Sequence, residues 1–284
     1  MDYPIGIIVQ STIILLMFLI VALELNHLYK VSKKQTKALE EFSNQNGFTP
    51  STPLETGSDK ERLGLLFQLG RKRQITNSIS GPIDGFRAFF YKYSFTVGHG
   101  KHQVKHNSLV CEVKIGNRLP HIFFDAKSTG HGVDKSVREI IQKANQIATP
   151  VELGDDFTMY VQTGLEQEAY ELFTPEILKG IRDYATKYDI EIVGDTLFLY
   201  CSEIPQKSAD YQYLFNTVGF FTAILKDNLK GFKMPPLPTK PGANLHDPRQ
   251  LTLLTGRQKL LLGLPAIFTI GFFLLILIFS LLSD

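Results

Sequence analysis

The chain has 284 residues, of which 44% are hydrophobic and 20% charged, and its formal net charge is +2. This is the composition of an ordinary folded protein, and it excludes a disordered chain or a strongly basic protein that coats nucleic acid. Apolar residues are concentrated at the two ends, whereas residues 58–232 have the mixed composition of a single globular domain.

Residues 4–23, PIGIIVQSTIILLMFLIVAL, form an uncharged apolar run. At 1.5 Å per residue, a helix of about 20 residues matches a hydrocarbon core about 30 Å thick. No basic stretch precedes the run and no small-residue cleavage site follows it. The pattern therefore predicts an uncleaved transmembrane helix and not a signal peptide.

Residues 24–57 predict a juxtamembrane helix and a linker. Apolar residues recur at spacings of three and four from Leu28 to Phe42, so the membrane helix is expected to continue and to end near Asn46 and Gly47. A turn-rich stretch follows. The capping-box pattern at 58–61 then predicts a short helix with Leu66 and Phe67 on its apolar side.

Strand patterns dominate residues 77–125. In residues 85–98, aromatic side chains at every second position predict a strand with one face buried along its length. Two further strands are predicted over 108–116 and 120–126, and the glycines and polar residues between the strands favour an antiparallel meander. Strand periodicity also indicates that four tyrosines are packing residues: Tyr91, Tyr93, Tyr160 and Tyr200.

The second half of the domain alternates helices and strands. A helix is predicted over 135–145, a strand over 157–162, a helix beginning at Thr174–Pro175, a hairpin turning at Gly194–Asp195 and a last helix over 209–228. The second of these helices is expected to bury one face, formed by Ile177, Ile181, Tyr184 and Tyr188. The predicted fold class is α+β: an antiparallel sheet with packed helices, flanked by one transmembrane helix at each end.

A Pro-rich linker over 233–259 leads to a second uncharged apolar run at 260–282. Basic residues flank both runs on the domain side only, and such residues are retained in the cytoplasm. We therefore expect a multi-pass protein of the cell membrane that crosses it with two helices. Both termini would lie outside and the central domain would be cytoplasmic. The flanking residues are Lys30, Lys33, Lys34, Lys37, Lys240, Arg249, Arg257 and Lys259.

The only two cysteines, Cys111 and Cys201, each fall inside a predicted strand. Neither has a histidine or a second cysteine at the spacing of a metal site. They are interpreted as buried reduced thiols, with a disulfide between them as the alternative. No cofactor is predicted.

Several motifs between Gly70 and Asp125 carry a family resemblance. A basic turn at 70–73 leads to Asn77 and Gly81, then to the aromatic strand at 89–93 and a Leu-Pro turn at 119–120; the helix start at 172–175 and the turn at Gly194 follow. This order resembles a family of uncharacterised bacterial membrane-associated proteins, over about two thirds of the chain. That family has no assigned activity, so the resemblance implies no functional residues.

Two basic clusters are candidate contacts for anions or lipid headgroups. Arg71, Lys72 and Arg73 form the basic turn, and each would gain about 1 kcal/mol beside an anionic membrane surface; ordinary solvated charge is the alternative. The second cluster has three imidazoles that could hold a transition metal if they shared a helix face. Neighbouring glycines favour a solvated hairpin loop, and the lysines would repel a cation. Its residues are His99, Lys101, His102, Lys105 and His106.

Asp125, His131 and Asp134 surround a polar loop where an acid, a base and a hydroxyl are available. The chain has no GxSxG, HExxH, GxxxxGK[ST] or paired CxxC motif. The leading hypothesis is a non-enzymatic, membrane-tethered module that binds the lipid surface or another membrane protein. The alternative is a membrane-bound, hydrolase-like enzyme using this loop. A nucleic-acid partner is not expected, and a transporter is disfavoured because neither membrane run has an ionisable residue.

Overall fold

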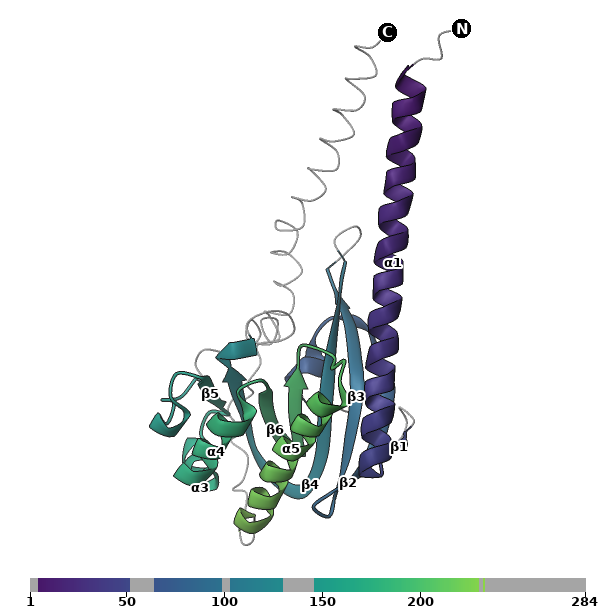
Figure 1. Ribbon diagram of the computed structural model, residues 1–284. Coiled ribbons are helices and arrows are strands. Elements are labelled where there is room, and N and C mark those ends of the chain that lie inside the picture. Colours follow the sequence, from purple (N-terminus) through teal and green to yellow (C-terminus); the bar gives the residue numbers. More distant parts are fainter. Residues whose placement is uncertain (1–4, 52–63, 99–102, 130–145, 230–231, 233–284) are drawn as a thin grey trace.

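The computed structural model describes residues 5–51, 64–98, 103–129, 146–229 and 232. In these residues, an antiparallel sheet of six strands is covered by helices (Figure 1). The α+β prediction is confirmed for this part of the chain. The predicted helix at 135–145, the linker at 233–259 and the second apolar run at 260–282 lie outside it.

The elements follow one another in the order below. They are α1 (Ile5–Asn46), β1 (Thr49–Pro50), η1 (Leu65–Gln68), β2 (Arg71–Ile83), β3 (Phe86–Val97), β4 (Val104–Ala126), η3 (Lys127–Thr129), η5 (Val151–Leu153), β5 (Phe157–Val161), α3 (Glu166–Leu172), α4 (Pro175–Ala185), β6 (Asp189–Cys201) and α5 (Ser208–Asn228).

Helix α1 is one uninterrupted helix of 42 residues. Large apolar side chains from Ile14 to Tyr29 are exposed, and the helix is long and apolar enough to cross a membrane. Its last turns are buried in the domain at Ala38, Leu39 and Phe42. The helix ends at Asn46 because Gly47 adopts the left-handed conformation, with φ of 69°. The predicted continuation of the first apolar helix, and its end, are confirmed.

Strand β4 organises the sheet. The strand order is β1-β2-β3-β4-β5, and β6 also pairs with β4. Strand β3 pairs with the first part of β4, from Val97↔Val104 to Ala88↔Val113, and β5 pairs with its last part. Strand β6 runs antiparallel along both parts.

Two predictions about these strands are wrong. The strands predicted over 108–116 and 120–126 are both parts of β4, and Gly194–Asp195 is not a hairpin turn because both halves of β6 pair with β4. Gly116 and Gly194 have positive φ values of 77° and 60°. They lie where the register between the two strands shifts, so the paired strands bend there together.

The bend is large. The Tyr200 hydroxyl donates a hydrogen bond of 2.6 Å to Glu191, nine residues earlier in the same strand. Nine residues of extended strand would span about 30 Å. The two halves of β6 therefore face each other across a strongly curved inner face of the sheet.

Strand β2 begins earlier than the sequence pattern indicated. Residues 71–73 were predicted as a turn, but they belong to the strand, and Arg71 pairs with Thr96 near the end of β3. Lys72 and Asn77 each have φ of 52°, next to the two register shifts between β2 and β3. These β-bulges interrupt the alternation of side chains that marks a strand, which explains the wrong prediction.

The sheet separates two apolar cores. On one face, α1, α3, α4 and α5 pack over Phe90, Phe124 and their neighbours. On the inner face, η1 places Phe67 against Tyr93, Phe198 and Tyr200. The predicted packing role of the tyrosines is confirmed for Tyr91, Tyr93 and Tyr200, whereas Tyr160 is only partly buried.

The helices of the second half agree with prediction except in two respects. Helix α4 begins with Pro175 and buries Ile177 and Ile181, but Tyr184 is exposed, so the predicted apolar face is wrong at this position. Helix α3 was not predicted. Helix α5 buries Leu214, Val218, Phe221 and Leu225, as the 3.6-residue period indicated.

Candidate functional site

The basic turn of the sequence meets Lys105 of the second basic cluster at one end of the sheet. Arg71 of β2 pairs with Thr96 of β3, and Thr96 pairs with Lys105 of β4. We call Arg71, Lys72, Arg73 and Lys105 the basic end. Residues far apart in the chain are joined here because three consecutive antiparallel strands share this edge.

No carboxylate in these strands neutralises the basic end. Between Glu61 and Glu112, Asp84 is the only acidic residue of the sequence, and it lies in the turn at the opposite end of β2 and β3. The pKa of Lys92, in the middle of β3, is lowered by burial and then by the positive charge of Lys105. The basic end therefore has a positive potential that suits an anion.

The arginines are held in place by the backbone. Arg71 donates from Nη2 to the carbonyl oxygen of Gly98 at 2.6 Å, and Arg73 donates from Nε to that of Leu69 at 3.2 Å. A guanidinium group has five N–H donors, so each keeps others for a phosphate oxygen. Lys72 and Lys105 are exposed.

The basic end is level with the middle of α1. Pairing of Pro50 with Ile79 places the C-terminal end of α1 near Ile79. The stretch from Ile79 to Arg71 contains two bulges and opposes only the six residues from Phe90 to Thr96, so it spans about 20 Å of strand. The same length of helix is about 13 residues and reaches back to about Lys33. Figure 1 agrees, since the described ends of β3 and β4 reach the level of the middle of α1.

The histidine cluster is not a helical metal site. Lys105 and His106 lie in strand β4, while His99, Lys101 and His102 fall outside the described residues. Among the residues that are described, no group of three or more potential ligands could hold a metal ion. His106 instead stacks on Phe95, with ring centroids 5.2 Å apart.

His106 is expected to make the fold sensitive to acid. Burial lowers its pKa below the ordinary value of 6.5, so the unfolded chain binds a proton more readily than the folded one. This contribution to stability is complete above pH 6.5 and is lost as the pH falls through the lowered folded-state value. Urea unfolding across this range should show a smaller acid-induced loss in His106→Leu than in the original chain. An identical pH dependence of stability in the two proteins would contradict this role of His106.

A buried polar network lies on the inner face. The Glu191 side chain is completely buried, yet its carboxylate accepts hydrogen bonds from the Tyr200 hydroxyl and from the Leu65 backbone N–H at 2.9 and 3.0 Å. The His121 Nε2 atom lies 2.5 Å from the same carboxylate. Burial, followed by the charge of Glu191, raises the pKa of Tyr200, which keeps this hydroxyl a donor. The network attaches η1 to the sheet.

Other acids are buried on the same face. Glu112 accepts a hydrogen bond of 2.7 Å from the Tyr91 hydroxyl, and Asp189 accepts one of 2.9 Å from the Ala126 backbone N–H. Asp125 is buried at the end of β4, and by register it lies beside Asp189. His131 and Asp134, the other members of the predicted hydrolytic loop, lie outside the described residues.

The sequence pattern did not identify this network. Glu112 and Lys114 are both charged residues of the strand predicted over 108–116, but the structure buries Glu112 and leaves Lys114 at the surface. A single acidic residue within an apolar strand, as in Glu191 of residues 190–193, is the only local signal. The cysteines are both free; Cys111 is buried as predicted, whereas Cys201 is partly exposed.

No protein-family model matches the chain, and no curated protein matches it. Among solved structures, the chain is similar to the mycobacterial trehalose monomycolate transport factor A, TtfA, with 13% identity and a TM-score of 0.47. The likeness covers 72% of this chain and 98% of that one. At this level of similarity it carries no argument about function.

Proposed function

We propose that this chain is a two-pass membrane protein whose cytoplasmic domain binds the anionic surface of the membrane through the basic end of its sheet. It acts as a non-enzymatic binding module. The observation that carries the proposal is the position of the basic end along the axis of α1, because this position sets its distance from the apolar run.

The basic end lies close to the lipid headgroups. If α1 crosses the membrane with residues 4–23, Lys33 lies about ten residues, or about 15 Å, beyond the apolar run. The headgroup layer extends about 5–8 Å from the hydrocarbon core, so the basic end lies about one Debye length beyond it. Because α1 is a continuous helix whose last turns are buried in the domain, this spacing is built into the fold.

The charge is sufficient for a substantial contact. Each Lys or Arg near an anionic surface contributes about 1 kcal/mol, so the four residues of the basic end would contribute at most about 4 kcal/mol. The attraction falls off within a Debye length of about 8 Å at physiological salt. A basic end displaced far from the headgroups would gain nothing.

The cytoplasmic orientation rests on Lys30, Lys33, Lys34 and Lys37, which follow the first apolar run on the domain side. The inner leaflet is also the one that carries anionic lipids. A membrane-impermeant maleimide added to intact cells should leave Cys201 unmodified until the membrane is permeabilised. Modification in intact cells would place the domain outside and refute the orientation.

Lysine footprinting tests the lipid contact on the unmodified chain. Full-length protein in nanodiscs is treated with an amine-acetylating reagent, and the rate at each lysine is measured by mass spectrometry. We expect Lys72 and Lys105 to react more slowly in anionic than in neutral nanodiscs, and high salt to remove the difference. Lys179 and Lys226, exposed on α4 and α5, serve as internal controls and should react equally in both.

A charge variant sharpens the test. Removing two charges with Arg71→Gln and Arg73→Gln should weaken the contact by at most about 2 kcal/mol, or about 30-fold, and so raise the reactivity of Lys72 and Lys105. The matched control, Lys179→Gln with Arg182→Gln, removes the same charge from α4. Equal lysine reactivity in neutral and anionic nanodiscs would refute the proposed lipid contact.

A further inference from the structure

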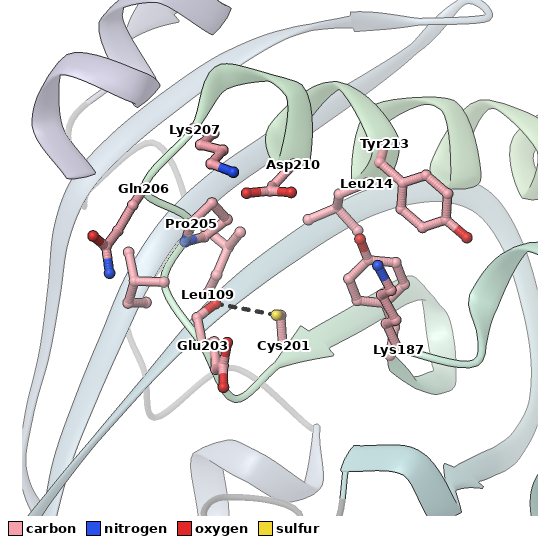
Figure 2. A pocket seen from close by; sticks show the side chains of 12 residues that line it. Leu109, Lys187, Cys201, Glu203, Pro205, Gln206, Lys207, Asp210, Tyr213 and Leu214 are labelled. Atoms are coloured by element: carbon pink, nitrogen blue, oxygen red, sulfur yellow. Dashed lines mark hydrogen bonds between the residues drawn. The ribbon is translucent and has the colours of Figure 1, made fainter. Parts of the chain in front are cut away.

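A cavity of about 430 Å³ opens where β6 passes into α5 (Figure 2). It lies on the helical face of the sheet and is distinct from the basic end. Its volume falls within the range of about 300–1,000 Å³ that is typical of small-molecule sites. No residue predicted as a binding site from the sequence contributes to it.

The cavity combines an apolar floor with a charged rim. Leu109, Tyr188 and Leu214 are buried at its floor. Four charged side chains line the opening, two of each sign, and Figure 2 shows them around the partly exposed Cys201. They are Lys187, Glu203, Lys207 and Asp210.

These charges are not paired with each other. None of the four forms an ion pair within the part of the chain that the structure describes, although Lys187 lies over the Tyr213 ring at 5.2 Å. Neighbouring charges of opposite sign that do not pair with each other are available to a ligand that carries both signs. The lining has no net charge, so a simple anion or a simple cation would meet as much repulsion as attraction.

Thiol chemistry does not account for the cavity. Burial raises the pKa of Cys201 to about 11, and its thiol donates a hydrogen bond to the Glu203 carbonyl oxygen at 3.1 Å. At neutral pH the sulfur is therefore a protonated thiol and a poor nucleophile. The arrangement favours reversible binding.

We propose that this cavity binds a small free zwitterion that has one ammonium group, one carboxylate or phosphate group and a short apolar body. Glu203 and Asp210 would receive the ammonium group, and Lys187 and Lys207 the anionic group. The apolar body would rest on the floor at Leu109, Tyr188 and Leu214. Amino acids and phosphoethanolamine belong to this class.

The position of the cavity favours a free molecule over a membrane lipid. Gln35 of α1 donates a hydrogen bond to the carbonyl oxygen of Ile204, a lining residue, at 3.3 Å. Gln35 follows the apolar run by about 12 residues, or about 18 Å of helix. That distance exceeds the headgroup layer of about 5–8 Å, so a lipid that remains in the bilayer would not reach the cavity.

The chain carries its own reporter for this site. Cys201 lines the cavity and is partly exposed, while Cys111, the only other cysteine, is fully buried. Full-length protein in nanodiscs is alkylated with N-ethylmaleimide at mildly alkaline pH, and modification of each cysteine is followed by mass spectrometry. Cys111 should stay unmodified as long as the protein is folded.

Free phosphoethanolamine and tyrosine are the probes, with ethanolamine and inorganic phosphate as single-charge controls. At about ten times its dissociation constant, a bound zwitterion should slow modification of Cys201 about tenfold. The controls should have little effect. Failure of a panel of free amino acids and phosphoethanolamine to protect Cys201 would overturn the proposal, as would protection only by phosphatidylethanolamine within the nanodisc.

Variants test the assigned roles. Lys187→Gln with Lys207→Gln, and separately Glu203→Gln with Asp210→Asn, should each abolish protection while Cys111 remains unmodified. Arg71→Gln with Arg73→Gln should leave the protection of Cys201 unchanged, because the cavity does not depend on the basic end. Full protection in both cavity variants would overturn the proposal.

Discussion

Replacing Glu191 by alanine is expected to lower the free energy of unfolding by about 3–5 kcal/mol. The substitution removes a buried carboxylate and leaves the Tyr200 hydroxyl and the Leu65 backbone N–H without their acceptor. His121 loses the same partner. Urea unfolding of the full chain in detergent, followed by near-UV circular dichroism of the tyrosines, measures the change.

The matched control is Asp195→Asn in the same strand. Asp195 pairs with Lys114 at 3.2 Å, but both side chains are 54% exposed. Exposed ion pairs of this kind contribute about 0–1 kcal/mol, so the control should be close to the original chain. Equal losses of unfolding free energy in the two variants would show that burial of Glu191 does not determine its contribution to stability.

Loss of the Glu191 network should also have a local effect. Helix η1 is attached to the sheet through Leu65, and Phe67 of η1 packs between rings of β3 and β6. Without the carboxylate, this helix should separate from the inner face before the whole domain unfolds. Hydrogen exchange at residues 65–68 would then rise more than exchange in α5.

Phe42→Ala is the second substitution with a large expected effect. Phe42 is fully buried and lies at the junction of α1, the sheet and α5, where its ring contacts those of Phe48, Phe90, Tyr211 and Phe215 with centroids 5.4–5.9 Å apart. Truncation of a buried phenylalanine costs about 3–5 kcal/mol. We expect a loss in this range in the same urea measurement.

This variant also separates stability from function. If the end of α1 leaves the domain, the basic end is no longer held at a fixed distance from the membrane. Lys72 and Lys105 should then lose their protection in anionic nanodiscs even where the domain remains folded. Leu28→Ala is the control, because Leu28 is on the same helix but 59% exposed. It should change neither stability nor footprint. Retained lysine protection in a folded Phe42→Ala protein would contradict the role of α1 as a rigid spacer.

The position of the basic end illustrates what a sequence can and cannot predict. The clusters at 71–73 and 99–106 were both recognised as basic, because charge is a property of the residues themselves. The approach of Arg71 and Lys105 depends on the register of β2 with β3 and of β3 with β4. Two bulges, at Lys72 and Asn77, set that register, and they conceal the first residues of β2 by interrupting its alternation.

The sequence by itself determined α1, β3, α4, α5 and the exposed apolar run, because each is marked by a local period of hydrophobic residues that needs no distant partner. Only the tertiary structure decided the bend of β4 and β6, the burial of Glu112 and Glu191, and the charged cavity at the start of α5. Each of these brings together residues far apart in the chain through strand pairing. A local period specifies which face of an element is apolar, but not what that face will meet.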